Sequence, residues 1–133
     1  MKKHILMLAI ASSCFIAGQA GAMTKDEYKV AKEKISADYK VDKAKCDTLK
    51  DNAKDICEKE AKGKEKVAKA ELEQAYKPTT AHMRKVAEEK NEAMYEVAKE
   101  KCDDMNGDAK NACVKQAKAD QSKGKAEAKA MKM

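Results

Sequence analysis

The chain has 133 residues, of which 39% are charged and only 4% are aromatic, and its formal net charge is +6. It contains no Trp, one Pro and five Gly. This composition excludes a membrane-spanning bundle, a collagen-like chain and a β-sandwich, which needs more β-branched and aromatic residues. A dry catalytic pocket needs apolar walls that this chain can hardly supply, so we expect a protein without enzymatic activity.

Residues 1–22 have the pattern of a secretory signal peptide. A basic start precedes an apolar run from Ile5 to about Ala17, and small residues then lead to Ala22. The apolar run is too short to span a bilayer, which takes about 20 residues. We therefore expect cleavage after Ala22 and secretion. The exported chain keeps 27 basic and 23 acidic residues, a net charge of about +4.

A second processing route is suggested by residues 11–14 (ASSC), which resemble a bacterial lipobox. In that case Cys14 would become the lipid-anchored first residue of a lipoprotein. Two features oppose this route, because Ala11 stands where a lipobox usually has Leu and the apolar run continues past Cys14. Either route leaves four of the five cysteines for the folded protein.

The rest of the chain contains an internal repeat. Residues 39–62 and 95–118 align at an offset of 56, with 12 of 24 positions identical and both cysteines of each segment matched. The single proline, Pro78, lies between the two copies. We therefore predict a first repeat over 23–77, a linker over 78–82 and a second repeat over 83–133.

Helix formers such as Ala, Lys, Glu and Met dominate the exported chain, and its apolar residues recur at helical spacing. The predicted helices cover residues 25–50, 52–77, 80–105 and 108–130. One predicted core stripe consists of Tyr28, Ala31, Ile35, Tyr39, Cys46 and Leu49, and a matching one of Met83, Val86, Ala87, Met94, Val97, Ala98 and Met105. A thinner stripe, mostly of alanine, consists of Ala53, Cys57, Ala61, Ala68, Leu72 and Ala75. Methionines at this spacing could ligate Cu(I), but they more commonly fill a helical core, which we expect here.

The core that these stripes can build is small. Only ten residues after Ala22 are Leu, Ile or Val, and none is Phe. Such a low content is typical of disordered chains, so we expect covalent staples to compensate for the missing core and the C-terminal end, from about Gln121, to be partly disordered.

Four cysteines follow the signal peptide, Cys46, Cys57, Cys102 and Cys113, and they form two C-x10-C units. An even number of cysteines behind a signal peptide indicates disulfides. The spacing is not that of zinc ligands, and His82 is the only histidine after the signal peptide, so we expect neither a metal nor another cofactor.

The pairing of these cysteines follows from helix geometry, with two solutions. Cysteines 11 apart on one helix lie about 16 Å apart, whereas a disulfide needs Cα atoms within about 7 Å. Asn106-Gly107 midway along the second unit is a strong turn signal, with Gly107 suited to a left-handed backbone and Asn52 and Asp108 to helix N-caps. We predict an all-α fold in which each half is an αα-hairpin stapled by its own disulfide, Cys46–Cys57 or Cys102–Cys113, and the four helices are antiparallel.

The alternative is one long helical hairpin that turns at Pro78. It would pair Cys46 with Cys113 and Cys57 with Cys102, as in the twin-Cys hairpins of the mitochondrial intermembrane space. The unbroken 11-residue period of the sequence favours this alternative, and the turn residues oppose it.

The segment CDTLKDNAKDIC (46–57), followed by KEAKGKEKVAKAEL (59–72), resembles a group of small uncharacterised secreted proteins of proteobacteria. In that group two Cys-paired segments follow a signal peptide. The resemblance covers nearly all of the exported chain and implies a periplasmic location, but it implies no activity and no functional residue. The Lys/Ala/Glu composition also resembles the helical stalk of the envelope protein TolA and late-embryogenesis-abundant stress proteins.

No catalytic, phosphate-binding or metal motif occurs in the sequence, and we read His82 and the charge runs 62–66 and 88–90 as solvated helix positions. A nucleic-acid partner is not expected, because the chain has one Arg and a modest net charge. We expect a non-catalytic periplasmic protein with a structural, protective or protein-binding role in the cell envelope. The alternative is a Lys-rich amphipathic binder of an anionic membrane surface or envelope polymer.

Overall fold

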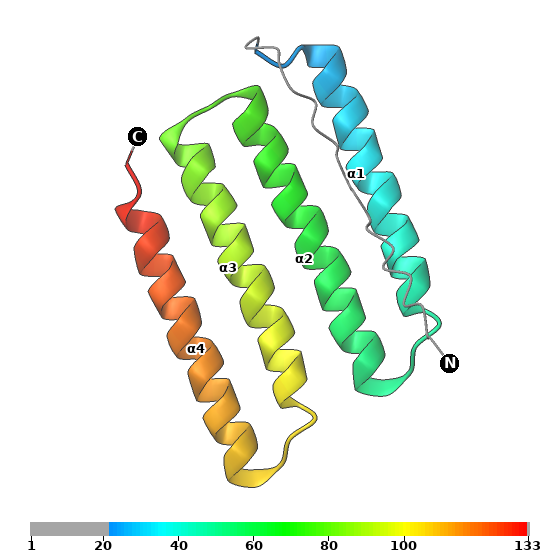
Figure 1. The fold of residues 1–133 in the computed structure, drawn as a ribbon, viewed down its shortest axis with the longest axis vertical. Helices are drawn as coiled ribbons and strands as arrows, with labels where there is room; N and C mark the ends of the chain where they lie inside the picture. Colours follow the sequence, from blue (N-terminus) through cyan, green and yellow to red (C-terminus); the bar gives the residue numbers. More distant parts are fainter. Residues whose placement is uncertain (1–21, 133) are drawn as a thin grey trace, which may run out of the picture.

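The computed structural model describes residues 22–132, and four helices account for most of them. They are α1 (Lys25–Cys46), α2 (Asp51–Tyr76), α3 (Thr80–Cys102) and α4 (Gly107–Ala130) (Figure 1). The predicted signal peptide and the predicted lipid site at Cys14 lie outside the described residues, apart from Ala22.

The predicted all-α fold with two disulfide-stapled hairpins is confirmed. Disulfides join Cys46 to Cys57 and Cys102 to Cys113, with Cα–Cα distances of 5.4 and 5.6 Å. The alternative pairing across one long hairpin is therefore wrong. The reason is local, because each 11-residue interval contains a turn that brings its two cysteines face to face.

The helices lie side by side in one layer (Figure 1). Within the described chain, α1 packs only on α2, α2 on α1 and α3, and α4 only on α3. The arrangement is thus an antiparallel row and not a closed bundle. It has two edge helices, two inner helices and two broad faces.

The turns of the two hairpins are alike. Asp51 and Gly107, which stand 56 residues apart, both have a positive φ, of 52° and 58°. The left-handed backbone predicted for Gly107 is therefore confirmed, although this residue begins α4 instead of ending α3. The first and third helices are shorter than predicted, because they end at Cys46 and Cys102, where the turns that the disulfides close begin.

The predicted N-caps at Asn52 and Asp108 are wrong. The N-cap positions of α2 and α4 are Lys50 and Asn106, and neither makes a side-chain capping hydrogen bond. Asn52 instead donates from Nδ2 to the backbone oxygen of Glu100 on α3, at 2.8 Å. Its position one residue past the left-handed Asp51 places its side chain between hairpins and not at a helix start.

The open ends of the hairpins are held by polar contacts. Tyr28 of α1 donates a hydrogen bond to Glu73 and stacks on Tyr76, with ring centroids 4.6 Å apart. The hydrogen bond to the Glu73 carboxylate raises the pKa of Tyr28. At the corresponding place in the second hairpin, Arg84 donates two hydrogen bonds to the backbone oxygen of Met131, at 2.9 and 3.1 Å.

The core is thin. Its apolar members are Cys46, Ala61, Ala70, Leu72, Cys102, Ala117 and Ala128. The largest fully buried side chains are Cys46 and Cys102, so the disulfides occupy the place that bulky aliphatic residues have in other helical proteins. The predicted disorder after Gln121 is not observed in the described part, because α4 continues to Ala130 and Ala128 is fully buried.

Removal of one staple is expected to cost much of the stability. Replacing Cys46 and Cys57 together by Ser should lower the free energy of unfolding by about 3 kcal/mol, because the closed loop restricts the unfolded chain. Urea unfolding followed by circular dichroism measures this change. A change below about 1 kcal/mol would contradict the large contribution to stability that we assign to the disulfide.

Candidate functional site

The junction between α2 and α3 carries the most distinctive chemistry of the molecule. At its centre a Cβ added to Gly63 would lie 2.7 Å from the Cβ of Ala93, which is closer than real Cβ atoms approach. Glycine therefore lets the two inner helices approach each other closely. The charge run 62–66 is not simply a solvated face, as the sequence suggested, because Gly63 is buried in the helix contact.

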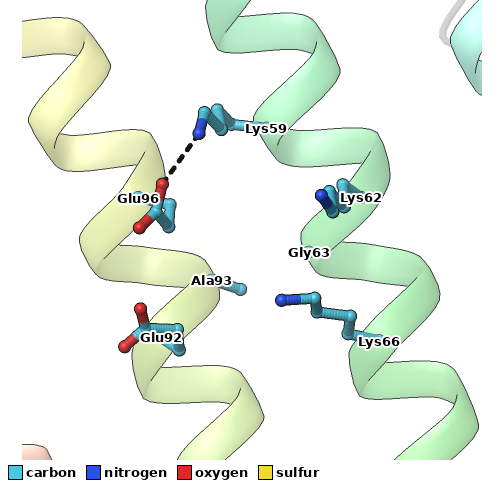
Figure 2. A pocket seen from close by; sticks show the side chains of 7 residues that line it. All are labelled: Lys59, Lys62, Gly63, Lys66, Glu92, Ala93 and Glu96. Atoms are coloured by element: carbon cyan, nitrogen blue, oxygen red, sulfur yellow. Dashed lines mark hydrogen bonds and ion pairs between the residues drawn. The ribbon is translucent and has the colours of Figure 1, made fainter.

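One face of this junction is charged. A shallow cleft of about 190 Å³ is lined by Lys59, Lys62, Gly63, Lys66, Glu92, Ala93 and Glu96 (Figure 2). Lys59 Nζ lies 2.9 Å from Glu96 Oε2 and 3.7 Å from Glu100 Oε1, so one lysine of α2 pairs with two carboxylates of α3. These pairs join the two hairpins across the row.

Hydrogen bonding dominates the electrostatics of this cluster. The hydrogen bond from Lys59 holds the pKa of Glu96 below its usual value. The same hydrogen bond raises the pKa of Lys59. Lys62 and Lys66 also line the cleft, and within the described chain neither makes an ion pair (Figure 2). The cleft is thus lined by charged groups of both signs, three lysines and the carboxylates of Glu92 and Glu96.

The opposite face of the junction is apolar. A groove of about 540 Å³ is lined by Glu71, Gln74, Ala75, Met83, Val86, Ala87, Lys90, Met131 and Lys132. A second groove, of about 440 Å³, is lined by Glu60, Ala93, Met94, Val97, Ala98 and Lys101. Both are open, and together they follow the length of α3. We call the α3 residues Met83, Val86, Ala87, Met94, Val97 and Ala98 the methionine face.

Ion pairs tie α2 to α3 along the methionine face. Lys90 Nζ lies 2.7 Å from Glu71 Oε1, and Lys101 Nζ lies 3.8 Å from Glu60 Oε1. The face thus combines apolar side chains with charged groups of both signs. Such a combination is common where proteins bind other proteins.

The prediction that the methionines fill the core is wrong in part. Met94 is 67% exposed, and Met105 is also exposed. The reason lies in the position of α3 between two neighbours. Its contact with α4 uses Asn91, which is buried and donates from Nδ2 to the backbone oxygen of Gln121 at 2.8 Å. Met94 lies about 60° from Asn91 around the axis of α3 and therefore points out of the layer, whereas Met105 lies in the turn after α3.

His82, which the sequence suggested is solvated, is half-buried at the start of α3. Its backbone N–H donates to Thr79 Oγ1 at 3.0 Å, and its ring Nδ1 lies 2.7 Å from the backbone oxygen of Lys77. These contacts are those of a helix N-terminus. Thr80 already belongs to α3, which therefore begins inside the predicted linker 78–82.

The four cysteines of the described chain are oxidised, and among residues 22–132 no group of three or more His, Cys, Asp and Glu side chains is placed to hold a metal ion. None of the four helices has an apolar stretch of the length that crossing a membrane requires. Comparisons with protein-family models, curated proteins and solved structures found no match.

The tight contact at Gly63 generates a prediction. Gly63→Ala should destabilise the protein by about 1–2 kcal/mol, although alanine is the better helix former, because the new methyl group forces α2 and α3 apart. The double variant Gly63→Ala/Ala93→Gly restores the space and should recover most of the loss. Thermal unfolding of the three proteins measures this, and a stabilised single variant would contradict the close contact.

The Lys59–Glu96 pair predicts an acid dependence of stability. The pKa of Glu96 is lower in the folded protein than in the unfolded chain, where a glutamate has a pKa of about 4.3. The ionised carboxylate therefore stabilises the fold at pH values above about 4.3, and this stabilisation is lost as the pH falls through the folded pKa. The urea midpoint should therefore fall more steeply below about pH 4.5 in the wild type than in Lys59→Met, which keeps the aliphatic stem. Parallel curves for the two proteins would contradict this.

Proposed function

We propose that this chain is a non-catalytic periplasmic protein that binds another protein of the cell envelope through the methionine face of α3. The observation that carries the proposal is the open apolar surface beside the α2–α3 junction, where Met94 is 67% exposed. Monomeric soluble proteins rarely leave continuous apolar surface uncovered unless it binds something. Methionine suits such a role because its flexible, polarizable side chain adapts to a partner.

Export is supported by two independent features. The chain begins with the pattern of a signal peptide, and its fold depends on two disulfides, which form and persist in oxidising compartments. Internal duplication of a stapled hairpin explains how a short chain builds two inner helices. The contact between these inner helices then creates the surface to which we assign binding.

A second candidate function rests on the opposite face. The charged cleft holds Lys62 and Lys66 without ion-pair partners in the described chain, and the exported protein is basic. Such a surface would contact an anionic membrane or envelope polymer weakly, with an affinity that falls as salt is added. The apolar groups lie on the other face of the layer, which makes insertion of the charged face into a bilayer unfavourable.

A photoreactive amino acid placed in living cells tests the proposal. At position 94 it should give discrete crosslinked adducts to another protein, and these adducts should disappear when Val97 is replaced by Lys beside it. At position 62, on the opposite face, it serves as the matched control and should give none of these adducts.

The second candidate function, binding to an anionic surface, predicts the opposite result. Protein binding would be contradicted if position 94 gave no adducts and the purified protein sedimented with anionic vesicles at low salt but not at high salt. That pair of results would favour binding to the membrane surface. Circular dichroism of each variant shows that the helices are intact.

A further inference from the structure

We propose that the outer edge of α1 is a self-association surface, on which a second copy of this chain packs through its own α1 in antiparallel orientation. This edge is separate from the methionine face of α3, so the inference does not depend on the proposed function. It consists of Val30, Ala37 and Val41 with the flanking charges Glu33 and Lys40.

The first support is exposure. In the described chain α1 packs only on α2, so its opposite side is open at the end of the row (Figure 1). Val30 is 66% exposed and Val41 is 54% exposed, and they stand among the few large apolar side chains that the layer leaves uncovered. Eleven residues make three helical turns, so both valines lie on one stripe, with Ala37 between them.

The second support is the likeness of this stripe to an established helix contact. At the offset of 56 that relates the two halves of the sequence, Val30, Ala37 and Val41 correspond to Val86, Ala93 and Val97. Those three residues lie on the side of α3 next to α2, where Ala93 meets Gly63 and both valines are half-buried. The outer edge of α1 therefore carries the apolar pattern of a surface that packs on a helix.

The third support is charge complementarity. Glu33 and Lys40 are exposed, and neither makes an ion pair within the described chain. They lie seven residues apart on one flank of the stripe, at nearly equal distances on either side of Ala37. When two α1 helices pack antiparallel with a two-fold axis near Ala37, Glu33 lies beside Lys40 of the second copy and the reverse pair forms as well.

Head-to-tail association through α4 is disfavoured by the same correspondence. In α4 the positions matching Lys59 and Gly63 are Lys115 and Ala119. Packed on α1 as α2 packs on α3, Lys115 would face Lys40, and Ala119 would add a methyl group where Gly63 leaves space. The outer edge of α1 is thus suited to a closed two-fold dimer and not to an open-ended array.

A single helix edge is a small interface, so the dimer should be weak and concentration-dependent. Sedimentation equilibrium of the disulfide-intact protein tests this up to about 1 mM. Val41→Lys should abolish the dimer, whereas Met94→Lys, at an exposed position on α3, should leave it unchanged. Glu33→Lys and Lys40→Glu should each weaken it about five-fold or more, and the double reversal should restore it.

Chemical crosslinking identifies which edges meet. With the native cysteines oxidised, a short bis-maleimide should link Ala37→Cys to itself. It should not link Ala37→Cys protein to Ala119→Cys protein when the two are mixed. A chain that stays monomeric over the whole concentration range would overturn the proposal. So would loss of the dimer with Met94→Lys but not Val41→Lys, or a preference for the 37–119 crosslink.

Discussion

Each disulfide of this protein joins an edge helix of the layer to an inner helix, and the rest of the structure depends on that constraint. Cys46 ties α1 to α2, and Cys113 ties α4 to α3. An edge helix has a neighbour on one side only, so it buries less apolar surface than an inner helix. Each disulfide closes a loop and so lowers the conformational entropy of the unfolded chain. In the chain-entropy model this stabilises the folded protein by about 3 kcal/mol per loop. Cys46 and Cys102 are also the largest fully buried side chains, so the staples serve as core as well.

The two inner helices are held in a different way. Gly63 permits α2 and α3 to approach closely, and Lys59 pairs across the junction with Glu96 and Glu100. Exposed ion pairs alone contribute little, so the close backbone approach is the stronger term. Because the helices form a single layer, neither broad face of the α2–α3 junction is covered by another described helix, and one face is charged while the other is apolar. Both surfaces therefore follow directly from the single-layer arrangement of the four described helices.

The sequence predicted the helices and favoured the local disulfide pairing over the long-hairpin alternative. Both follow from short-range chemistry, namely helix propensity and the turn formed around Asn106-Gly107. The sequence was not sufficient to predict that the helices form a single layer. Whether four amphipathic helices form a bundle or a row depends on contacts between residues far apart in sequence, such as Gly63 with Ala93. A glycine inside a charge run gives no sign of this contact.

The methionines illustrate the same limit. The 11-residue spacing of Met83 and Met94 correctly indicates a common stripe, but spacing alone does not say which stripe of a helix with two neighbours is buried. In the contact between α3 and α4, the buried Asn91 of α3 lies against Gly124 of α4, and this pair is too polar and too small to stand out in a hydrophobic pattern. Sequence periodicity therefore found the candidate surface and assigned it to the core.

The central claim is that a disulfide holds an edge helix on a packed pair of inner helices. Residue-resolved hydrogen exchange of the variant that lacks Cys46 and Cys57 tests this claim most directly. The account predicts that amides of α1 lose protection first and by the largest factor, while those of α2 and α3 near the Gly63–Ala93 contact stay the most protected. Protection of α1 equal to that in the wild type would contradict the account. Simultaneous loss of protection in all four helices would contradict it too, because the inner pair would then have no stability of its own.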